Sequence, residues 1–140
     1  MSIVVFLFGC ALFMSTLSEG LPFCAYRIYT LTERGKNSKT DNPISIKFHI
    51  DGSTSPWHNL DSDVNDRERQ HWDRYIVPNS GNGHLTGVTV RNLKTDGWEI
   101  EAIYVKNLCT NRVYEFYCTG SCWVDSPAAT TKFLPRSNTI

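Results

Sequence analysis

The chain has 140 residues, in which 14 Lys and Arg are balanced by 14 Asp and Glu, so the formal net charge is zero. This length is typical of a single domain. The zero charge argues against a general nucleic-acid-binding protein, which usually carries a basic surplus. Apolar residues make up 41% of the chain and charged residues 20%, so it can bury a core and is not a disordered tail.

Residues 1–20 are predicted to form a cleaved signal peptide. Residues 3–17 are nearly all apolar, and no charged side chain occurs before Glu19. The apolar run is shorter than the ~20 residues that a membrane span needs. Small residues follow it, and cleavage after Ser18 or Gly20 fits them. No Lys or Arg precedes the run, so an uncleaved anchor is the alternative. We therefore expect a secreted chain whose domain covers residues 21–125.

The cysteines predict two disulfides. The chain has five, and removal of residues 1–20 takes away Cys10 and leaves Cys24, Cys109, Cys118 and Cys122. An even number of cysteines in an oxidising compartment is typical of a disulfide framework. Of the three possible connectivities we favour Cys24–Cys109 with Cys118–Cys122, because the last two are close in sequence. Zinc is the alternative, but no His or Cys pair with ligand spacing completes such a site.

Hydrophobic residues then recur with a period of two, which predicts β-strands. The first stretches are 25–30 and 44–50, and in the second Ile44, Ile46, Phe48 and Ile50 alternate with polar residues. Further strands are predicted at 72–77, 85–90, 98–105 and 112–118, with turn signals rich in Gly, Asn, Asp and Pro between them. No helical stretch separates these strands, so an antiparallel β-sandwich is expected.

Two segments do not look like strands. Residues 61–74 carry five acids and three arginines, and we interpret them as a long solvated loop that leads into a strand. Residues 126–140 are polar, contain Pro127 and Pro135, and are predicted to be a flexible tail. The tryptophans in or beside strands, Trp72, Trp98 and Trp123, and residues 75–77 are expected to belong to the core.

The order of these patterns resembles the PLAT domain, also called the lipoxygenase homology (LH2) domain. The family's Trp-x-Leu-x-x-Ile-x-Val strand is matched by residues 98–105, and its Tyr-x-Phe-x-Cys before a Trp by residues 114–118 and Trp123. Leu85, Val88 and Val90 match a Leu-x-x-Val-x-Val strand, and Thr40-Asp41 matches the end of a loop. The resemblance covers about residues 23–124. The segment between Phe48 and Leu60 is longer than usual, and Cys122 is not a general feature of the family.

The resemblance implies a β-sandwich of two four-stranded antiparallel sheets. It also implies a targeting module that docks onto a membrane lipid surface or onto a lipid-associated protein, often beside a catalytic domain. We expect a monomer with no nucleic-acid partner. The alternative function is a secreted protein- or carbohydrate-binding β-sandwich, such as a defence or venom-like factor, with a flat aromatic patch and no lipid affinity.

The sequence carries no catalytic motif, so we do not expect an enzyme. The four histidines, His49, His58, His71 and His84, have no metal-ligand spacing and are expected to be exposed. There is no Gly-x-Ser-x-Gly elbow, no His-Glu-x-x-His motif and no Gly-rich phosphate loop. A small hydrolase built from scattered Ser, His and Asp residues is the remaining catalytic alternative.

Trp57, with its neighbours Pro56 and His58, is the best candidate for contact with a membrane or partner. A Trp between Pro and polar residues suits a lipid–water boundary, because the ring is largely apolar and its N–H is polar. The alternative is that Trp57 folds back onto the sandwich and caps the core.

No cofactor is required by any motif, and calcium is left open. Calcium takes about six to eight oxygen ligands, mostly from carboxylates and carbonyls. Asp41 sits at the Thr-Asp position that resembles the ligand-bearing loop of calcium-binding relatives, and Asp96 lies in another turn before Trp98. The alternative is that these acids are solvated turn residues.

Overall fold

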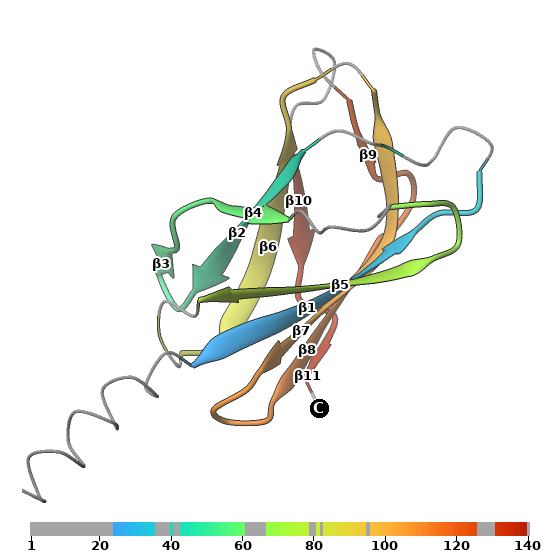
Figure 1. Cartoon of the computed structure of the whole chain (residues 1–140). Coiled ribbons are helices and arrows are strands. Elements are labelled where there is room, and N and C mark those ends of the chain that lie inside the picture. Colours follow the sequence, from blue (N-terminus) through green and yellow to red (C-terminus); the bar gives the residue numbers. More distant parts are fainter. Residues whose placement is uncertain are drawn as a thin grey trace, which may run out of the picture.

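The computed structural model describes residues 24–35, 40, 43–60, 67–78, 81, 83–94, 96–125 and 131–139. The predicted signal peptide lies outside the described residues, as do residues 61–66 of the acidic segment. The described residues form eleven β-strands (Figure 1). Within these ranges, no helix is long and apolar enough to cross a membrane.

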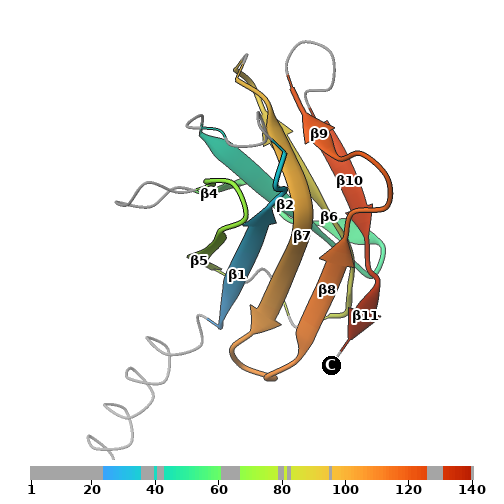
Figure 2. The same cartoon turned by 90° about the vertical axis from the view of Figure 1, so that its right-hand side faces the viewer.

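One sheet, here called the β1 sheet, has the strand order β11-β8-β7-β1-β5, with β9 paired to β7. Its pairs are all antiparallel. Figure 2 shows β11, β8, β7, β1 and β5 side by side as one layer. The strands are β1 (Ala25–Thr32), β5 (Trp72–Pro78), β7 (Trp98–Asn107), β8 (Val113–Tyr117), β9 (Trp123–Val124) and β11 (Asn138–Thr139).

The other sheet, here called the β2 sheet, has the order β10-β6-β2-β3, with β4 also paired to β2. A tight turn joins β2 to β3, and Asp51 and Gly52 have φ angles of 24° and 79° there. Glycine suits this left-handed backbone conformation, because glycine has no Cβ that would clash with the backbone. The strands are β2 (Ile44–Ile50), β3 (Ser53–Thr54), β4 (His58–Leu60), β6 (Leu85–Asn92) and β10 (Thr131–Pro135).

The predicted all-β antiparallel sandwich is confirmed, but the sheets have six and five strands rather than four each. The strands β1, β2, β5, β6, β7 and β8 appear where the period of two predicted them. The additional strands β3, β4, β9 and β11 are two or three residues long. A strand of that length cannot display a hydrophobic period, so these four could not be read from the sequence.

The prediction of a flexible tail at residues 126–140 is wrong over residues 131–139. β10 pairs with β6, and β11 pairs with β8. Leu134 is the one buried hydrophobic side chain of β10, so the segment lacks an alternating pattern. Pro135 is tolerated because β10 is an edge strand, where a missing N–H costs no ladder bond. Residues 126–130 lie outside the described part of the chain.

The core lies between the two sheets and follows the strand alternation. β1 and β2 bury every second residue, including Tyr26, Ile28, Ile46 and Phe48. Trp98 is fully buried, as predicted, and its indole Nε1 donates a hydrogen bond to Thr32 Oγ1 at 2.9 Å. Trp123 is half-buried in β9.

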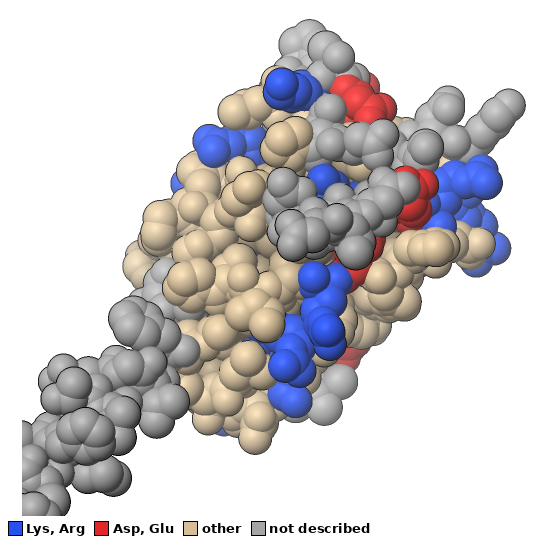
Figure 3. Space-filling view, viewed as in Figure 1, with Lys and Arg blue, Asp and Glu red and all other residues tan. Residues whose placement is uncertain are grey.

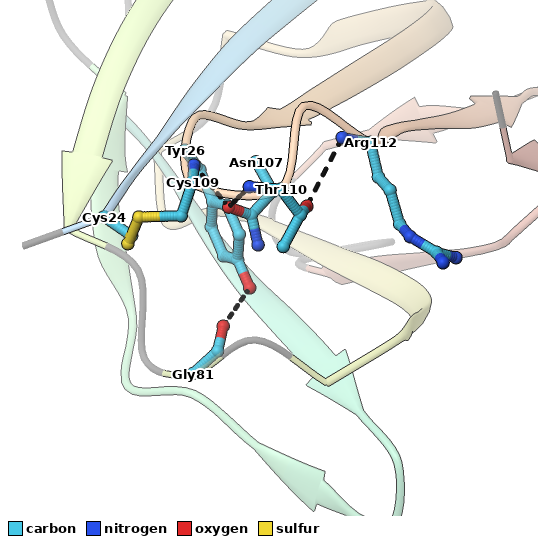
Figure 4. The surroundings of a disulfide bond; sticks show 7 residues. All are labelled: Cys24, Tyr26, Gly81, Asn107, Cys109, Thr110 and Arg112. Atoms are coloured by element: carbon cyan, nitrogen blue, oxygen red, sulfur yellow. Dashed lines mark hydrogen bonds between the residues drawn. A yellow bond between two sulfur atoms is a disulfide. The ribbon is translucent and has the colours of Figure 1, made fainter.

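Both predicted disulfides are present. Cys24–Cys109 and Cys118–Cys122 have Cα separations of 5.3 and 6.0 Å. Figure 4 shows the first beside the turn after β7, where Asn107 Oδ1 accepts hydrogen bonds from the backbone N–H of Cys109 at 2.9 Å and of Thr110 at 3.2 Å. The bridge therefore ties the start of β1 to a turn that is already well ordered by Asn107.

Tyr26, close to this disulfide, extends from β1 to the opposite side of the sandwich. Its hydroxyl donates to the carbonyl of Gly81 at 3.1 Å (Figure 4). Burial, with the neighbouring Tyr114 adding to it, raises the pKa of Tyr26 to about 12. Tyr26 is therefore a neutral donor at neutral pH, and it supports the backbone just before β6.

Candidate functional site: an aromatic and cationic sheet face

Trp57, the leading sequence candidate, lies in the short connection between β3 and β4 and is half-buried. Two cations cover its ring: Lys47 Nζ lies 4.6 Å and Arg91 Cζ 4.1 Å from the ring centroid. Both come from the outer face of the β2 sheet, where Lys47 on β2 and Arg91 on β6 are diagonal neighbours. Trp57 is therefore held against the outside of a sheet and does not cap the core.

The residues around Trp57 fix this position. The Ser55 hydroxyl accepts the backbone N–H of Phe48 at 2.9 Å and donates to the carbonyl of Pro56 at 2.8 Å. Pro56 itself is exposed. His58 is half-buried beside the Phe48 ring, with 5.7 Å between ring centroids. Its Nε2 is buried and has no hydrogen-bond partner, and burial lowers the pKa of His58.

The prediction that all four histidines are exposed is correct for His71 and His84 and wrong for His49 and His58. His49 bonds Thr89 Oγ1 through Nε2 at 2.7 Å and packs edge-on against Phe133. Burial, and to a smaller degree the charge of Lys47, lowers the pKa of His49. The polar-face position was correct, but neighbouring side chains on the sheet cover part of the ring.

The acidic candidates for calcium do not converge in the described residues. Asp41 lies outside them. Asp96 has a structural role: its Oδ2 and its carbonyl accept hydrogen bonds from Thr40 Oγ1 at 3.1 and 2.8 Å, and the carbonyl also accepts from Asn92 Nδ2 at 2.8 Å. No group of three or more His, Cys, Asp or Glu side chains with metal-site geometry occurs among the described residues.

A different surface stands out, the outer face of the β1 sheet. Trp72 is 49% and Ile76 62% exposed, so the expectation that both belong to the core is wrong. The alternate side chains of β5, Tyr75 and Val77, are buried and face the core. The sequence contained an indication of this orientation. Arg74 lies on the same side of the strand as Trp72 and Ile76, and an arginine there indicates that this side faces solvent.

The strand register places these side chains in rows across the sheet. Residues directly opposite one another in antiparallel strands point to the same face. The first row is Ile76, Arg27, Lys106 and Val113; the second is Arg74, Tyr29, Tyr104 and Glu115; the third is Trp72, Leu31, Ala102 and Tyr117. Cations therefore lie on the first two rows and aromatic rings on the second and third.

Three of these rings line an open hollow of about 250 Å³: Tyr29, Trp72 and Tyr104. The Trp72 and Tyr104 ring centroids are 5.0 Å apart with a tilt of 51°. Only apolar surface of these residues lines the hollow. Aromatic ring faces carry negative electrostatic potential, so the hollow offers flat, electron-rich walls without a competing polar group.

A hydroxyl chain borders the hollow on the β8 side. Tyr117 donates a short hydrogen bond to Glu115 Oε2, and the Tyr104 and Tyr117 hydroxyl oxygens are 2.9 Å apart. Because the Tyr117 proton is committed to the carboxylate, Tyr104 is the donor in the second bond. The bond to Glu115, then the bond to Tyr104, raises the pKa of Tyr117. Glu115, which is 6% exposed, lies at one end of the second row, and its carboxylate accepts the Tyr117 hydroxyl there.

The cations of this face are not neutralised. Among the described residues, none forms a hydrogen bond or ion pair with the side chains of Arg27, Arg74 or Lys106. Figure 3, drawn from the side of Figure 1, shows Lys and Arg side chains gathered over the region where β5, β1 and β7 lie. Unpaired cations beside exposed Trp72 and Ile76 give this face the composition of a binding surface rather than of an ordinary solvated sheet.

Comparison with known proteins places the fold. No family model and no curated protein sequence matches the chain. Solved structures do match: a lipoxygenase variant at TM-score 0.70 and 18% identity, covering 82% of this chain and 17% of that one. A coral 8R-lipoxygenase, described as activated by calcium through a C2-like domain, matches at TM-score 0.70 and 19% identity over 81% of this chain and 17% of that one. The alpha-toxin of Clostridium absonum matches at TM-score 0.62 and 21% identity, covering 79% and 31% of the two chains.

The fold is therefore the C2-like β-sandwich of the PLAT type, as the sequence resemblance implied. The chain spans about a sixth of the lipoxygenase chains that it matches, so it corresponds to a small domain of them. Its two disulfides are of the kind found in oxidising compartments.

Proposed function

We propose that this chain is a secreted, non-catalytic module that docks onto membrane lipid. The observation that carries the proposal is the exposure of Trp72 and Ile76 next to the unpaired Arg27, Arg74 and Lys106. Indole rings concentrate at the lipid–water boundary, and Lys and Arg side chains interact with lipid phosphates. A PLAT-type fold in chains named as lipoxygenases and alpha-toxin supports the same role.

The outer face of the β1 sheet is the proposed main contact. Trp57, Pro56 and His58 remain a second proposed contact, on the other sheet. Trp57 contributes less in this proposal, because Lys47 and Arg91 already cover its ring and a lipid would have to displace them. Calcium binding by Asp41 and Asp96 is an optional part of the proposed function. The relatives described as calcium-dependent make it worth testing, and Asp96 would have to release Thr40 to bind the ion.

Co-sedimentation with lipid vesicles tests the proposal. The mature chain, with both disulfides formed, is mixed with sedimentable vesicles in calcium and, separately, in chelator. We expect pelleting in both conditions, with any increase in calcium assigned to Asp41 and Asp96 by their Asn variants. Absence of pelleting on zwitterionic and on anionic vesicles alike would contradict a lipid-docking function and favour a protein or carbohydrate partner.

A further inference from the structure

The second row of the β1 sheet is polarised. It runs from the cationic Arg74, across Tyr29 and Tyr104, to the carboxylate of Glu115. Arg27, next to Tyr29 on β1, and Lys106, next to Tyr104 on β7, add positive charge along the neighbouring row, and Trp72 adds a third ring beside the middle of the second row. A ligand that matches this row carries an anion at one end and, next to it, a group that prefers aromatic faces and tolerates a nearby carboxylate.

Resting on the proposed lipid-docking function, we propose that this row binds the phosphocholine headgroup of a zwitterionic membrane lipid. The trimethylammonium group fills the hollow of Tyr29, Trp72 and Tyr104, and the phosphate lies toward Arg74 and Arg27. Quaternary ammonium groups bind in aromatic cages through cation–π attraction, which is strongest for Trp. Guanidinium groups bind phosphate through paired N–H donors.

The size of phosphocholine and the order of its charged groups fit this row. A hollow of about 250 Å³ accommodates a trimethylammonium group, and it is open, so a lipid in a membrane reaches it from outside. In phosphocholine only an ethylene bridge separates phosphate from ammonium. In the sheet, neighbouring strands are about 5 Å apart, so an anion over β5 and a cation over β1 and β7 match that separation.

Electrostatics favours a zwitterion over a simple cation or anion. A lone quaternary ammonium would be repelled by Arg74 and Arg27, whose charges no described residue neutralises. A lone phosphate held by Arg74 and Arg27 would leave the aromatic hollow unused. The zero net charge of the chain agrees with a headgroup that has no net charge, because long-range attraction to an anionic surface is then not required.

Titration with soluble phosphocholine, followed by tryptophan fluorescence and by the indole N–H resonances, tests the inference. We expect saturable binding that shifts the Trp72 indole signal and leaves the buried Trp98 signal in place. Trp72→Ala is expected to weaken binding by about tenfold, the effect of about 1.4 kcal/mol of cation–π and packing energy. Phe133→Ala is the matched control, because Phe133 is 48% exposed on the outer face of the other sheet. If Trp72→Ala does not fold, the wild-type indole shifts decide alone.

The charge end is tested with Arg74→Glu, for which Lys94→Glu, an exposed lysine outside the face, is the control. We expect Arg74→Glu to reduce phosphocholine affinity by about tenfold or more and choline affinity far less, because choline has no phosphate.

Vesicles then identify the source of the headgroup and separate this inference from the proposed function. If phosphatidylcholine vesicles bind the protein and release it when soluble phosphocholine is added, both the docking function and the phosphocholine inference are supported. If the protein binds vesicles equally well without phosphatidylcholine, or if soluble phosphocholine does not change vesicle binding, the proposed headgroup is wrong. The proposed docking function is not contradicted by that result. Binding of soluble phosphocholine without any vesicle binding contradicts the docking function and overturns the membrane source. Trp72-dependent binding of saccharides instead of phosphocholine overturns the inference as well.

Discussion

Trp98 on β7 and Thr32 on β1 meet through a buried hydrogen bond, with 2.9 Å between the indole Nε1 and the threonine Oγ1. Both side chains are fully buried. The indole N–H therefore depends on this one hydroxyl and cannot exchange it for water. We expect Thr32→Val to lower the free energy of unfolding by about 1–3 kcal/mol, the cost of leaving a buried donor unpaired.

Chemical denaturation of the oxidised protein measures this loss, and Thr131→Val on an exposed strand position serves as the control. An unchanged denaturation midpoint for Thr32→Val would show that the bond contributes nothing net.

The two disulfides should differ in their contribution to stability. Cys24–Cys109 closes a loop with a sequence separation of 85, whereas that of Cys118–Cys122 is 4. In the chain-entropy model, removal of the long bridge costs about 4–5 kcal/mol and removal of the short one about 2 kcal/mol. Paired Cys→Ser variants compared by urea denaturation give the two values. Equal losses would indicate that local strain or residual structure, not loop closure, sets the effect.

Stability should fall on mild acidification because of His58. Burial lowers its pKa in the folded state, so the unfolded chain binds the proton more tightly. The contribution of the neutral ring is thus present above the unfolded pKa, about 6.5, and is lost as the pH falls toward the lower folded value. His58→Gln should flatten the change in thermal midpoint between about pH 7 and pH 5. His49, whose pKa is also lowered by burial, contributes to the pH dependence that remains. A His58→Gln profile that parallels the wild type would contradict this assignment.

Two tryptophans distinguish the two proposed lipid contacts. Trp57→Ala removes the ring between Lys47 and Arg91 and is expected to cost about 1 kcal/mol of stability while vesicle binding is largely kept. Trp72→Ala should do the reverse, because its half-exposed ring contributes little to the core. Co-sedimentation and thermal denaturation of both variants give the comparison. Loss of vesicle binding in Trp57→Ala alone would move the contact to the β2 sheet.

Gly87 on β6 should not accept a side chain. A Cβ there would lie 2.5 Å from the Phe133 ring and 3.1 Å from the carbonyl of Leu134. Gly87→Ala is therefore expected to displace β10 from β6 and to destabilise the fold by about 1–3 kcal/mol. Amide hydrogen exchange of residues 131–134 would report the displacement. Phe133→Ala should relieve it, and protection that is unchanged in Gly87→Ala would show that the ring moves away at no cost.

The long strands could be predicted because each buries one face, so that the alternation of Ile44, Ile46 and Phe48 is visible in the sequence. The burial of Trp98 followed from its place in a strand, and both disulfides followed from the even number and the spacing of the cysteines. What could not be predicted depends on register. Tyr29, Tyr104 and Trp72 come from three strands, and only the pairing of β1 with β5 and β7 brings them together. Aromatic residues also favour the core in general, which concealed the outward phase of Trp72.

β10 and β11 belong to different sheets although one residue pair, Arg136 and Ser137, separates them. β10 covers the outer edge of β6, and β11 covers the outer edge of β8. Without this segment each sheet would end in a long strand with unpaired N–H and C=O groups, the template on which chains add to one another as fibrils. Proteolytic removal of residues 131–139 would therefore expose one edge of each sheet at once and give the domain two edges at which further chains can add.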